Sequence, residues 1–319
     1  MRSLPAAGAH GGDGRSVANA LGLDPDSFLD LSQSLNPVAP DPIPIIARHM
    51  SALRRYPDTQ RAHAALSESI EVDPARLLLT NGGAEAIALV AAEMGGSVTG
   101  PEFDLYPRGD GPLWRSNPHN PSGLLAGPGQ VASVWDEAFY PLATGRWTRG
   151  DEGAVVVGSL TKLLACPGLR AGYVLAEPEF VERCRLRQPT WAVNSLATSA
   201  LPEMLAAVNL RTWSAAVATL REQLVGVLVS HNLVVRPSDA NWVLVERRGL
   251  REQLAPHGIL VRDCSSFGLR GVTRIAVPSS AGIEALDEAL SLIDSRENIH
   301  LRTPRPTSWY AGTEQKEAP

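Results

Sequence analysis

Apolar residues in the first two thirds of the chain fall into short β-type runs and longer stretches at helical spacing. The β-type runs are Leu77–Thr80, Ala154–Val157 and Tyr173–Leu175. Each is short and bounded by turn residues, which favours buried strands. The apolar spacing predicts helices over residues 45–53, 82–94 and 178–186.

The last third reads as a smaller unit of helices and strands. Leu220, Leu224 and Val227 recur at helical spacing within residues 196–230. Strands are predicted at 233–235, 242–245, 260–261 and 273–277, with a helix between 249 and 255 and a closing helix over 284–294. We therefore predict an N-terminal arm (1–45), a large domain (46–195), a small C-terminal α+β domain (196–296) and a polar, disordered tail (297–319).

Composition narrows the class of protein. The 319 residues carry a formal net charge of −5. The sequence has no basic stripe of the kind that would predict nucleic acid as a partner. No apolar stretch has the length of a membrane span, and residues 1–9 lack the apolar core of a secretory signal. The three cysteines are widely spaced, without metal-type pairing. These features favour a cytoplasmic protein without a membrane partner or a metal.

The chemistry is concentrated between two apolar runs, in residues 158–173. Lys162 follows a predicted buried strand, where desolvation favours a neutral, nucleophilic amine. Arg170 follows a Pro-Gly turn and can hold a phosphate as a planar fork. Ser159 and Thr161 add hydroxyl groups on either side of the lysine. This set meets the requirements of a Schiff base to pyridoxal phosphate (PLP).

Ser-Leu-Thr-Lys followed by Pro-Gly-Leu-Arg-x-Gly-Tyr resembles the cofactor-lysine motif of the class I/II aminotransferase superfamily of PLP enzymes. Within it, the chain looks most like the threonine-phosphate decarboxylases of cobalamin biosynthesis, with the histidinol-phosphate aminotransferases as near relatives. The resemblance implies the α/β fold type I: a large PLP-binding domain with a mixed, mostly parallel sheet, and a small C-terminal α+β domain.

The resemblance implies cofactor contacts before the lysine motif. Gly83 and Ala84 follow a strand and open a helix, a ready site for the cofactor phosphate. Relatives usually have a hydroxyl residue at the position of Ala84. Phe103 matches the aromatic residue that stacks on the cofactor ring, although an ordinary core phenylalanine is the alternative.

Two further motifs belong to the cofactor site. In Asn117–Gly123, which resembles Asn-Pro-x-Asn-Pro-Thr-Gly, Asn120 matches the residue that contacts the phenolic oxygen of the cofactor. Asp136 ends a predicted strand and matches the carboxylate that keeps the pyridine nitrogen protonated. Phe139 stands where aminotransferases commonly carry tyrosine, as in the decarboxylase relatives.

The arm carries implied substrate contacts. His10 matches a histidine that helps to hold the substrate phosphate, and Asn36 belongs to an Asp-x-Ser-x-x-x-Asn-Pro pattern. Ser34 stands where relatives have a second phosphate-binding residue, an asparagine. Tyr56 matches a tyrosine that reaches the cofactor phosphate of the partner subunit, which implies a homodimer with shared sites; an ordinary turn tyrosine is the alternative.

The small domain contributes two arginines. Arg274 begins a predicted strand and matches the residue that forks the substrate carboxylate, and Arg262 matches a residue of the same pocket. A planar guanidinium suits bidentate pairing with a carboxylate. A surface salt bridge is the alternative for each.

The segment from Met94 to Asp136 is much shorter than in the relatives. About two strand-plus-helix units of the sheet are expected to be absent, at ~30 residues or more per unit. The sheet is either trimmed at an edge or compensated by the partner subunit.

The same residues serve two reactions of an amino acid substrate, so the motifs alone do not choose between them. The resemblance favours PLP-dependent decarboxylation of O-phosphothreonine or a similar phosphorylated amino acid. An aminotransferase of the histidinol-phosphate type is the alternative. A third interpretation is a PLP-fold protein without turnover, suggested by the short segment, Ala84 and Ser34.

Overall fold

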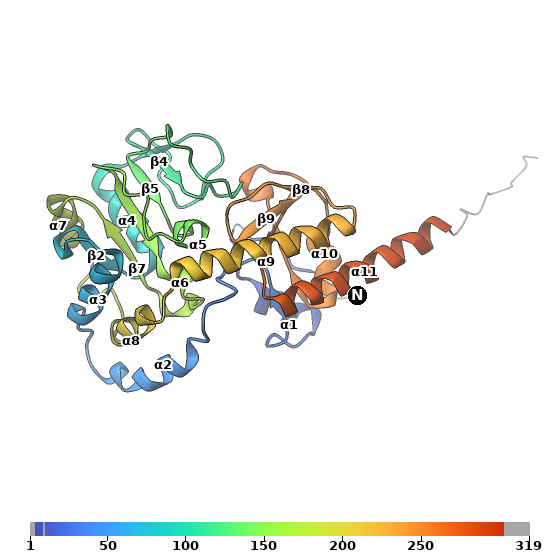
Figure 1. Ribbon diagram of the computed structural model, residues 1–319, viewed down its shortest axis with the longest axis horizontal. Coiled ribbons are helices and arrows are strands. Elements are labelled where there is room, and N and C mark those ends of the chain that lie inside the picture. The colour runs from blue at the N-terminus through green and yellow to red at the C-terminus, as the bar shows by residue number, and fades with distance from the viewer. Residues whose placement is uncertain (1–3, 9, 303–319) are drawn as a thin grey trace, which may run out of the picture.

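A six-stranded sheet forms the centre of the larger of two lobes (Figure 1). The computed structural model describes residues 4–8 and 10–302. From one edge to the other, the strands are β2 (Leu77–Thr80), β7 (Gly172–Leu175), β6 (Val155–Ser159), β5 (Val134–Asp136), β4 (Leu113–Ser116) and β3 (Ser97–Val98). Strands β3 to β6 are parallel, and β7 is antiparallel to both neighbours. The predicted α/β class with a mixed, mostly parallel sheet is confirmed.

Helices cover both faces of this sheet because its strands alternate between two cores. Val155 and Val157 pack with Val90 of α4 (Gly82–Met94) and Val181 of α7 (Pro178–Arg187). Val156 points to the other face, into a core shared with helices of the large lobe. The remaining helices of this lobe are α2 (Ile43–His49), α3 (Gln60–Ile70), α5 (Tyr140–Thr144), α6 (Leu160–Leu163), α8 (Ser195–Ala206) and the short 3₁₀ helices η1 (Met50–Arg54), η2 (Pro74–Arg76) and η3 (Pro167–Leu169).

One long helix, α9 (Leu210–Ser230), links the lobes (Figure 1). Its first turn places Trp213 in a core of the large lobe, and its later turns place Leu224 and Leu228 in the core of the small lobe. An antiparallel sheet in the order β11 (Arg262–Asp263), β12 (Thr273–Ala276), β9 (Trp242–Val245) and β8 (Val235–Arg236) forms this smaller α+β unit. It is completed by α10 (Leu250–Leu254), η4 (Ala255–His257), η5 (Ser265–Phe267) and α11 (Ser280–Arg302).

The N-terminal arm docks on the small lobe before it crosses to the large one. Its strand β1 (Leu29–Asp30) pairs in parallel with β10 (Ile259–Leu260), and its helix α1 (Gly14–Leu21) buries Val17 against Leu260. At the other end of the chain, α11 continues to Arg302 instead of ending near Asp294. The rest of the predicted tail, 303–319, lies outside the described residues.

The short segment between α4 and β5 keeps its strands. Residues 94–133 supply β3 and β4, and the connections 99–112 and 117–133 contain no helix. Parallel strands are usually joined through a helix, whereas these two connections join β3 to β4 and β4 to β5 without one.

Arg149 holds the second of these connections against the sheet. Its guanidinium lies 4.9 Å from the centre of the Trp135 ring. It donates hydrogen bonds to the Gln130 carbonyl oxygen at 2.9 Å and to Asp151 Oδ1 at 2.7 Å. One side chain thus ties the backbone of this connection to Trp135 of β5.

The described part of the chain contains neither a membrane-spanning helix nor a cluster of metal-binding side chains. None of its helices is long and apolar enough to cross a membrane. None of its His, Cys, Asp and Glu side chains gather in groups of three that could hold a metal ion.

Candidate active site

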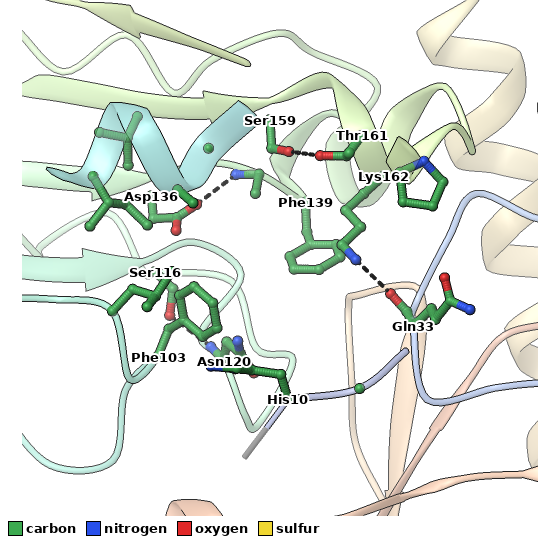
Figure 2. A pocket seen from close by; sticks show the side chains of 18 of the residues that line it. His10, Gln33, Phe103, Ser116, Asn120, Asp136, Phe139, Ser159, Thr161 and Lys162 are labelled. Atoms are coloured by element: carbon green, nitrogen blue, oxygen red, sulfur yellow. Dashed lines mark hydrogen bonds between the residues drawn. The ribbon is translucent and has the colours of Figure 1, made fainter. Parts of the chain in front are cut away.

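A cleft lies where the two lobes and the arm meet (Figure 2). Strands β4, β5 and β6 end at the same edge of the sheet, and Ser116, Asp136 and Ser159 at their carboxyl ends all line the cleft. The carboxyl edge of an open parallel sheet is the usual place for a ligand. The small lobe adds Arg262 and Arg274 to the wall.

Lys162 lies on α6, the single helical turn that follows β6. Its Nζ donates a hydrogen bond to the Gln33 carbonyl oxygen at 3.0 Å, across the cleft from the arm (Figure 2). Burial, then the positive charges of Arg274 and Arg170, lower the pKa of Lys162 to about 8. A substantial fraction of the amine is therefore neutral near physiological pH and available as a nucleophile.

Asp136 is the carboxylic acid among the described residues that line the cleft. Tyr106 Oη donates a hydrogen bond to its Oδ2 at 2.7 Å, and the Ala138 N–H donates to its Oδ1 at 2.9 Å. Burial raises the pKa of Asp136, while these two donors favour the carboxylate. Burial also raises the pKa of Tyr106 well above its usual value, so the phenol stays a donor. The arrangement suits a carboxylate that pairs with a positively charged ring nitrogen.

One end of the cleft collects donors for an anion. The first turn of α4, with Gly83 and Ala84, faces Ser159, Thr161 and Arg170 in the cleft wall. Ser159 Oγ and Thr161 Oγ1 are hydrogen-bonded to each other. A helix N-terminus with nearby hydroxyls and a guanidinium binds phosphate groups well.

Glycines allow this end to close up. A Cβ on Gly82 would lie 2.5 Å from Arg170 Nη2, and one on Gly172 would lie 2.5 Å from the Gly82 carbonyl carbon. Gly82 also has φ of +77°, a conformation that favours glycine. The cradle therefore depends on missing side chains at Gly82 and Gly172.

Aromatic rings and the arm form the other walls. The ring centres of Phe103 and His10 lie 5.6 Å apart at an interplanar angle of 63°. Phe139 packs edge-to-face on Trp242, with ring centres 4.7 Å apart. Phe103, His10 and Phe139 all line the cleft (Figure 2).

The two arginines of the small lobe lie directly opposite each other on antiparallel strands, with Arg262 of β11 in register with Arg274 of β12. Arg274 is buried, and it donates hydrogen bonds to Asn120 Oδ1 at 2.9 Å and to the Ser32 carbonyl oxygen at 3.4 Å. Burial and the neighbouring Arg262 lower the pKa of Arg274 to about 9. Like charges in register are unfavourable, so this pair favours an anion between or beside them.

Three predicted site residues are not brought to the cleft wall. Tyr56 is 75% exposed and stacks on Trp191, with ring centres 4.3 Å apart. Ser34 and Asn36 are buried behind the lysine turn. Asn36 donates from its backbone N–H to the Lys162 carbonyl oxygen at 3.0 Å and from Nδ2 to the Leu163 carbonyl oxygen at 2.9 Å. In this structure, Asn36 supports the lysine turn instead of facing a substrate.

The structure adds cleft residues that the motifs did not single out. Ser32 and Gln33 of the arm, Ser116 of β4 and Tyr106 line the wall. Ser32 lies two residues before Ser34, and Tyr106 lies three residues after Phe103. Both are in segments that the motifs had already assigned to the site, so their nearness to predicted site residues could have identified them. The contact between Tyr106 and Asp136 joins segments that are far apart in the chain, and no local pattern marks it.

Comparisons with known proteins place this geometry in a family. The family model for class I and II aminotransferases matches residues 110–293, more than half of the chain. The chain belongs to the class I and II aminotransferase family. Enzymes of this family use PLP and act on amino-acid-type substrates, so this chain is a PLP-dependent enzyme of that family.

Individual relatives carry two different names. A threonine-phosphate decarboxylase of Salmonella typhimurium is 28% identical, with 88% of this chain and 95% of the relative covered. A histidinol-phosphate aminotransferase of Dechloromonas aromatica is 27% identical, with 86% and 93% covered. The first alignment spans 354 positions, more than the 319 residues of this chain, so that relative has segments without counterparts here.

Structural similarity supports the same fold. The histidinol-phosphate aminotransferase of Clostridium acetobutylicum superposes with a TM-score of 0.75 at 20% identity, covering 84% of this chain and 100% of that one. The neighbours are PLP enzymes of fold type I, as predicted.

The residues of the cleft fit PLP. The glycine cradle at α4, with Ser159, Thr161 and Arg170, would hold the phosphate group. Asp136 would pair with the ring nitrogen, and Lys162 would form the covalent bond. Phe103 offers a ring face. Ala84 provides no hydroxyl group, so the phosphate would depend on the backbone at that position.

Proposed function

We propose that this PLP enzyme decarboxylates O-phosphothreonine, or a similar phosphorylated amino acid, to an amino-alcohol phosphate for cobalamin biosynthesis. The observation that carries the proposal is the in-register pair Arg262 and Arg274, which with His10 lines the cleft in addition to the residues of the cofactor cradle. A phosphorylated amino acid brings a carboxylate and a phosphate, and these groups match the positive charge at this end. The similarity to threonine-phosphate decarboxylase supports the same substrate class.

The residues of the chain would divide the work as follows. PLP, when bound, supplies an electron sink for the charge left on the substrate Cα after a bond there breaks. Arg274 would fix the carboxylate, and Asn120, which accepts a hydrogen bond from Arg274, would hold that guanidinium in place. Asp136 would keep a proton on the ring nitrogen. After CO₂ leaves, Lys162 Nζ would deliver a proton to Cα, which balances the reaction.

Phe139 favours decarboxylation over amino transfer. It is the residue that matches the decarboxylase relatives, whereas aminotransferases commonly have tyrosine at this position. Its ring packs on Trp242 and offers no hydrogen bond. The alternative function is amino transfer on histidinol phosphate or another amino acid, which the second relative favours.

A single incubation separates these functions. Purified, PLP-loaded protein is mixed with phosphothreonine, with and without 2-oxoglutarate, and CO₂ and glutamate are followed. We expect CO₂ without any keto acid. Glutamate that forms only with 2-oxoglutarate would establish the aminotransferase instead. Absence of both products, with borohydride fixing the cofactor on Lys162, would support a protein that binds PLP without this turnover.

A further inference from the structure

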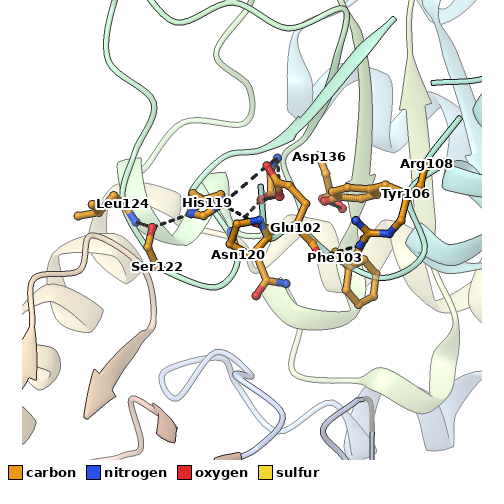
Figure 3. A network of polar contacts seen from close by, with 11 residues as sticks. Glu102, Phe103, Tyr106, Arg108, His119, Asn120, Ser122, Leu124 and Asp136 are labelled. Carbon is orange, nitrogen blue, oxygen red and sulfur yellow. Dashed lines mark hydrogen bonds and ion pairs between the residues drawn. The ribbon is translucent and has the colours of Figure 1, made fainter. Parts of the chain in front are cut away.

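A buried glutamate lies behind the wall of the cleft, and none of the roles above uses it. Glu102 is 3% exposed and lies in the helix-free connection between β3 and β4, one residue before Phe103 (Figure 3). Its carboxylate accepts hydrogen bonds from the Ser116 N–H at 3.2 Å and from the Ser116 hydroxyl. Both of these donors belong to the last residue of β4, which lines the cleft.

Ser116 links Glu102 to the turn that contains Asn120. Its Oγ accepts a hydrogen bond from the Asn120 N–H at 2.7 Å, while its own proton points to Glu102. The side chain of Asn120 then accepts from Arg274 Nη1 at 2.9 Å. A continuous chain of hydrogen bonds therefore runs from Glu102 through Ser116 and Asn120 to Arg274.

A second contact ties the same two segments together. His119 Nε2 lies 2.9 Å from the Pro101 carbonyl oxygen, which only accepts, so Nε2 carries the proton. His119 Nδ1 then accepts from the Ser122 hydroxyl at 2.7 Å. Figure 3 shows His119 and Glu102 side by side between the two connections. Neither connection has a helix, so these side chains supply the rigidity there.

We propose that Glu102 is a positioning residue of the active site, which acts through Ser116 to hold the Asn120 turn in its cofactor-binding geometry. An ionised carboxylate accepts both Ser116 donors at once, which leaves Ser116 Oγ oriented to accept from Asn120. A protonated carboxyl has one oxygen fewer to offer as an acceptor, and the turn loses its support. The inference rests on PLP binding alone, and it holds for a decarboxylase and for an aminotransferase.

The charges around Glu102 make this support sensitive to pH. Burial raises the pKa of Glu102 to about 7, although the Ser116 hydrogen bonds oppose the rise. Asp136 on β5 also raises it, and Arg115 on β4 lowers it. His119 lies 3.9 Å away, and burial lowers the pKa of that imidazole, so it stays neutral. The carboxylate is therefore the form that predominates above pH 7.

The test compares the PLP affinity of the full chain with that of Glu102→Gln across pH 6 to 9. We expect the variant to bind PLP about tenfold more weakly at pH 8.5, the effect of a hydrogen bond to a charged group, with the ratio falling towards one near pH 6. Asp110→Asn is the matched control, because Asp110 is an exposed acid in the same connection; its ratio to wild type should stay at one. Titrations of the cofactor itself affect all three proteins equally and cancel in the ratio.

A double-mutant cycle separates positioning from simple packing. If Glu102 acts through Ser116, then the double variant Glu102→Gln with Ser116→Ala should lose no more PLP affinity than the single variant that binds PLP more weakly. The proposal would be overturned if the fold-losses in PLP affinity of the two single variants multiplied in the double variant. It would also be overturned if the ratio of PLP affinities between Glu102→Gln and wild type did not change with pH. Should Glu102→Gln fail to fold, Ser116→Ala alone must show the same pH-dependent ratio to wild type.

Discussion

Single side chains set the protonation states on which this site depends. Lys162 sits among Arg170, Arg262 and Arg274, and the burial and positive charge there keep its amine partly neutral. Asp136 has no ion pair among the described residues, and Tyr106 is the side chain that stabilises its charged form. Both residues are therefore tuned by neighbours that come from other segments of the chain.

At the residue scale, Lys162 predicts a pH dependence of cofactor attachment. The amine reacts when neutral, and its pKa is lowered to about 8, so the rate of attachment should rise as pH increases through about 8 and then level off. Replacing Arg274 with Gln removes one positive charge, and the same rise should shift to higher pH. Stopped-flow absorbance after mixing with PLP measures both profiles. An unchanged midpoint in the variant would contradict this account of the lysine.

Tyr106→Phe tests the support of Asp136. Loss of the hydroxyl leaves Oδ2 without that donor, which should weaken PLP binding by about 1–3 kcal/mol, the cost of an unsatisfied buried acceptor. Fluorescence titration of the apoprotein measures the dissociation constant. Tyr140→Phe is the control, since Tyr140 is a buried tyrosine of the same lobe that does not line the cleft. Equal affinities of the two variants would show that the Tyr106 hydroxyl is dispensable.

A site residue could be predicted from the sequence when it lies in a recognisable motif, and not when its contact joins segments without one. Lys162, Asp136 and Gly83 lie in motifs that resemble those of the family, and the resemblance implied that they share one site; all three line the cleft. Asn36 was predicted as a substrate contact, but its partners are backbone atoms of the lysine turn. The link from Glu102 to Ser116 joins separate connections, and only the folded chain brings these two residues together.

At the scale of elements, the helix-free crossovers change what stabilises the sheet. Local packing of a helix is replaced by long-range side-chain contacts such as those of Arg149. The apolar pattern predicted a strand at 260–261, which overlaps β10, but not its pairing with β1, because such a pattern does not specify the partner strand. Short elements of this kind are decided by tertiary packing.

Arg149→Ala should lower the free energy of unfolding by about 2–4 kcal/mol, because it removes a partly buried guanidinium with its aromatic contact and several hydrogen bonds. Urea denaturation followed by circular dichroism measures the change. Arg146→Ala is a suitable control on the same segment, with an expected change within about 0.5 kcal/mol. A loss for Arg149→Ala no larger than that of the control would mean that the connection is held by other contacts.

The junction between α9 and α11 should respond to pH. His231 ends α9, with Nδ1 2.7 Å from Asp294 Oδ2 and Nε2 2.7 Å from Asp287 Oδ1. Burial disfavours its charge, but the two aspartates outweigh burial and raise its pKa. The stabilisation is therefore complete below the unfolded pKa of about 6.5, and it is lost as pH rises through the higher folded value. Melting temperatures from pH 5.5 to 8.5 should show this loss in wild type and a flatter profile in His231→Asn.

At the scale of the whole molecule, an apolar surface beside α2 and η1 indicates a partner. Ile43, Met50, Leu53 and the stacked pair of Tyr56 and Trp191 are all more than half exposed. Tyr56 was predicted to reach the cofactor of a second subunit, and its position outside its own cleft agrees with that hypothesis. We propose a homodimer in which each site borrows this tyrosine.

Subunit mixing tests the shared site. Lys162→Ala and Tyr56→Ala should each be far less active than wild type when measured alone. After the two are unfolded and refolded together, random pairing gives hybrid dimers with one intact site, so roughly a quarter of the wild-type activity should return. No recovery, with dimers confirmed by light scattering, would mean that each subunit uses only its own residues.

The route of the arm determines when the enzyme becomes competent during its synthesis. Leu29 pairs with Ile259 of the small lobe, and Gln33, a few residues later, accepts the hydrogen bond from Lys162. The arm leaves the ribosome well before its docking strand does, because β1 and β10 are far apart in the chain. Contacts so distant in sequence form late. Lys162 is thus enclosed by the arm only after β10 has emerged, so a nascent chain that stops before β10 has no finished cleft wall.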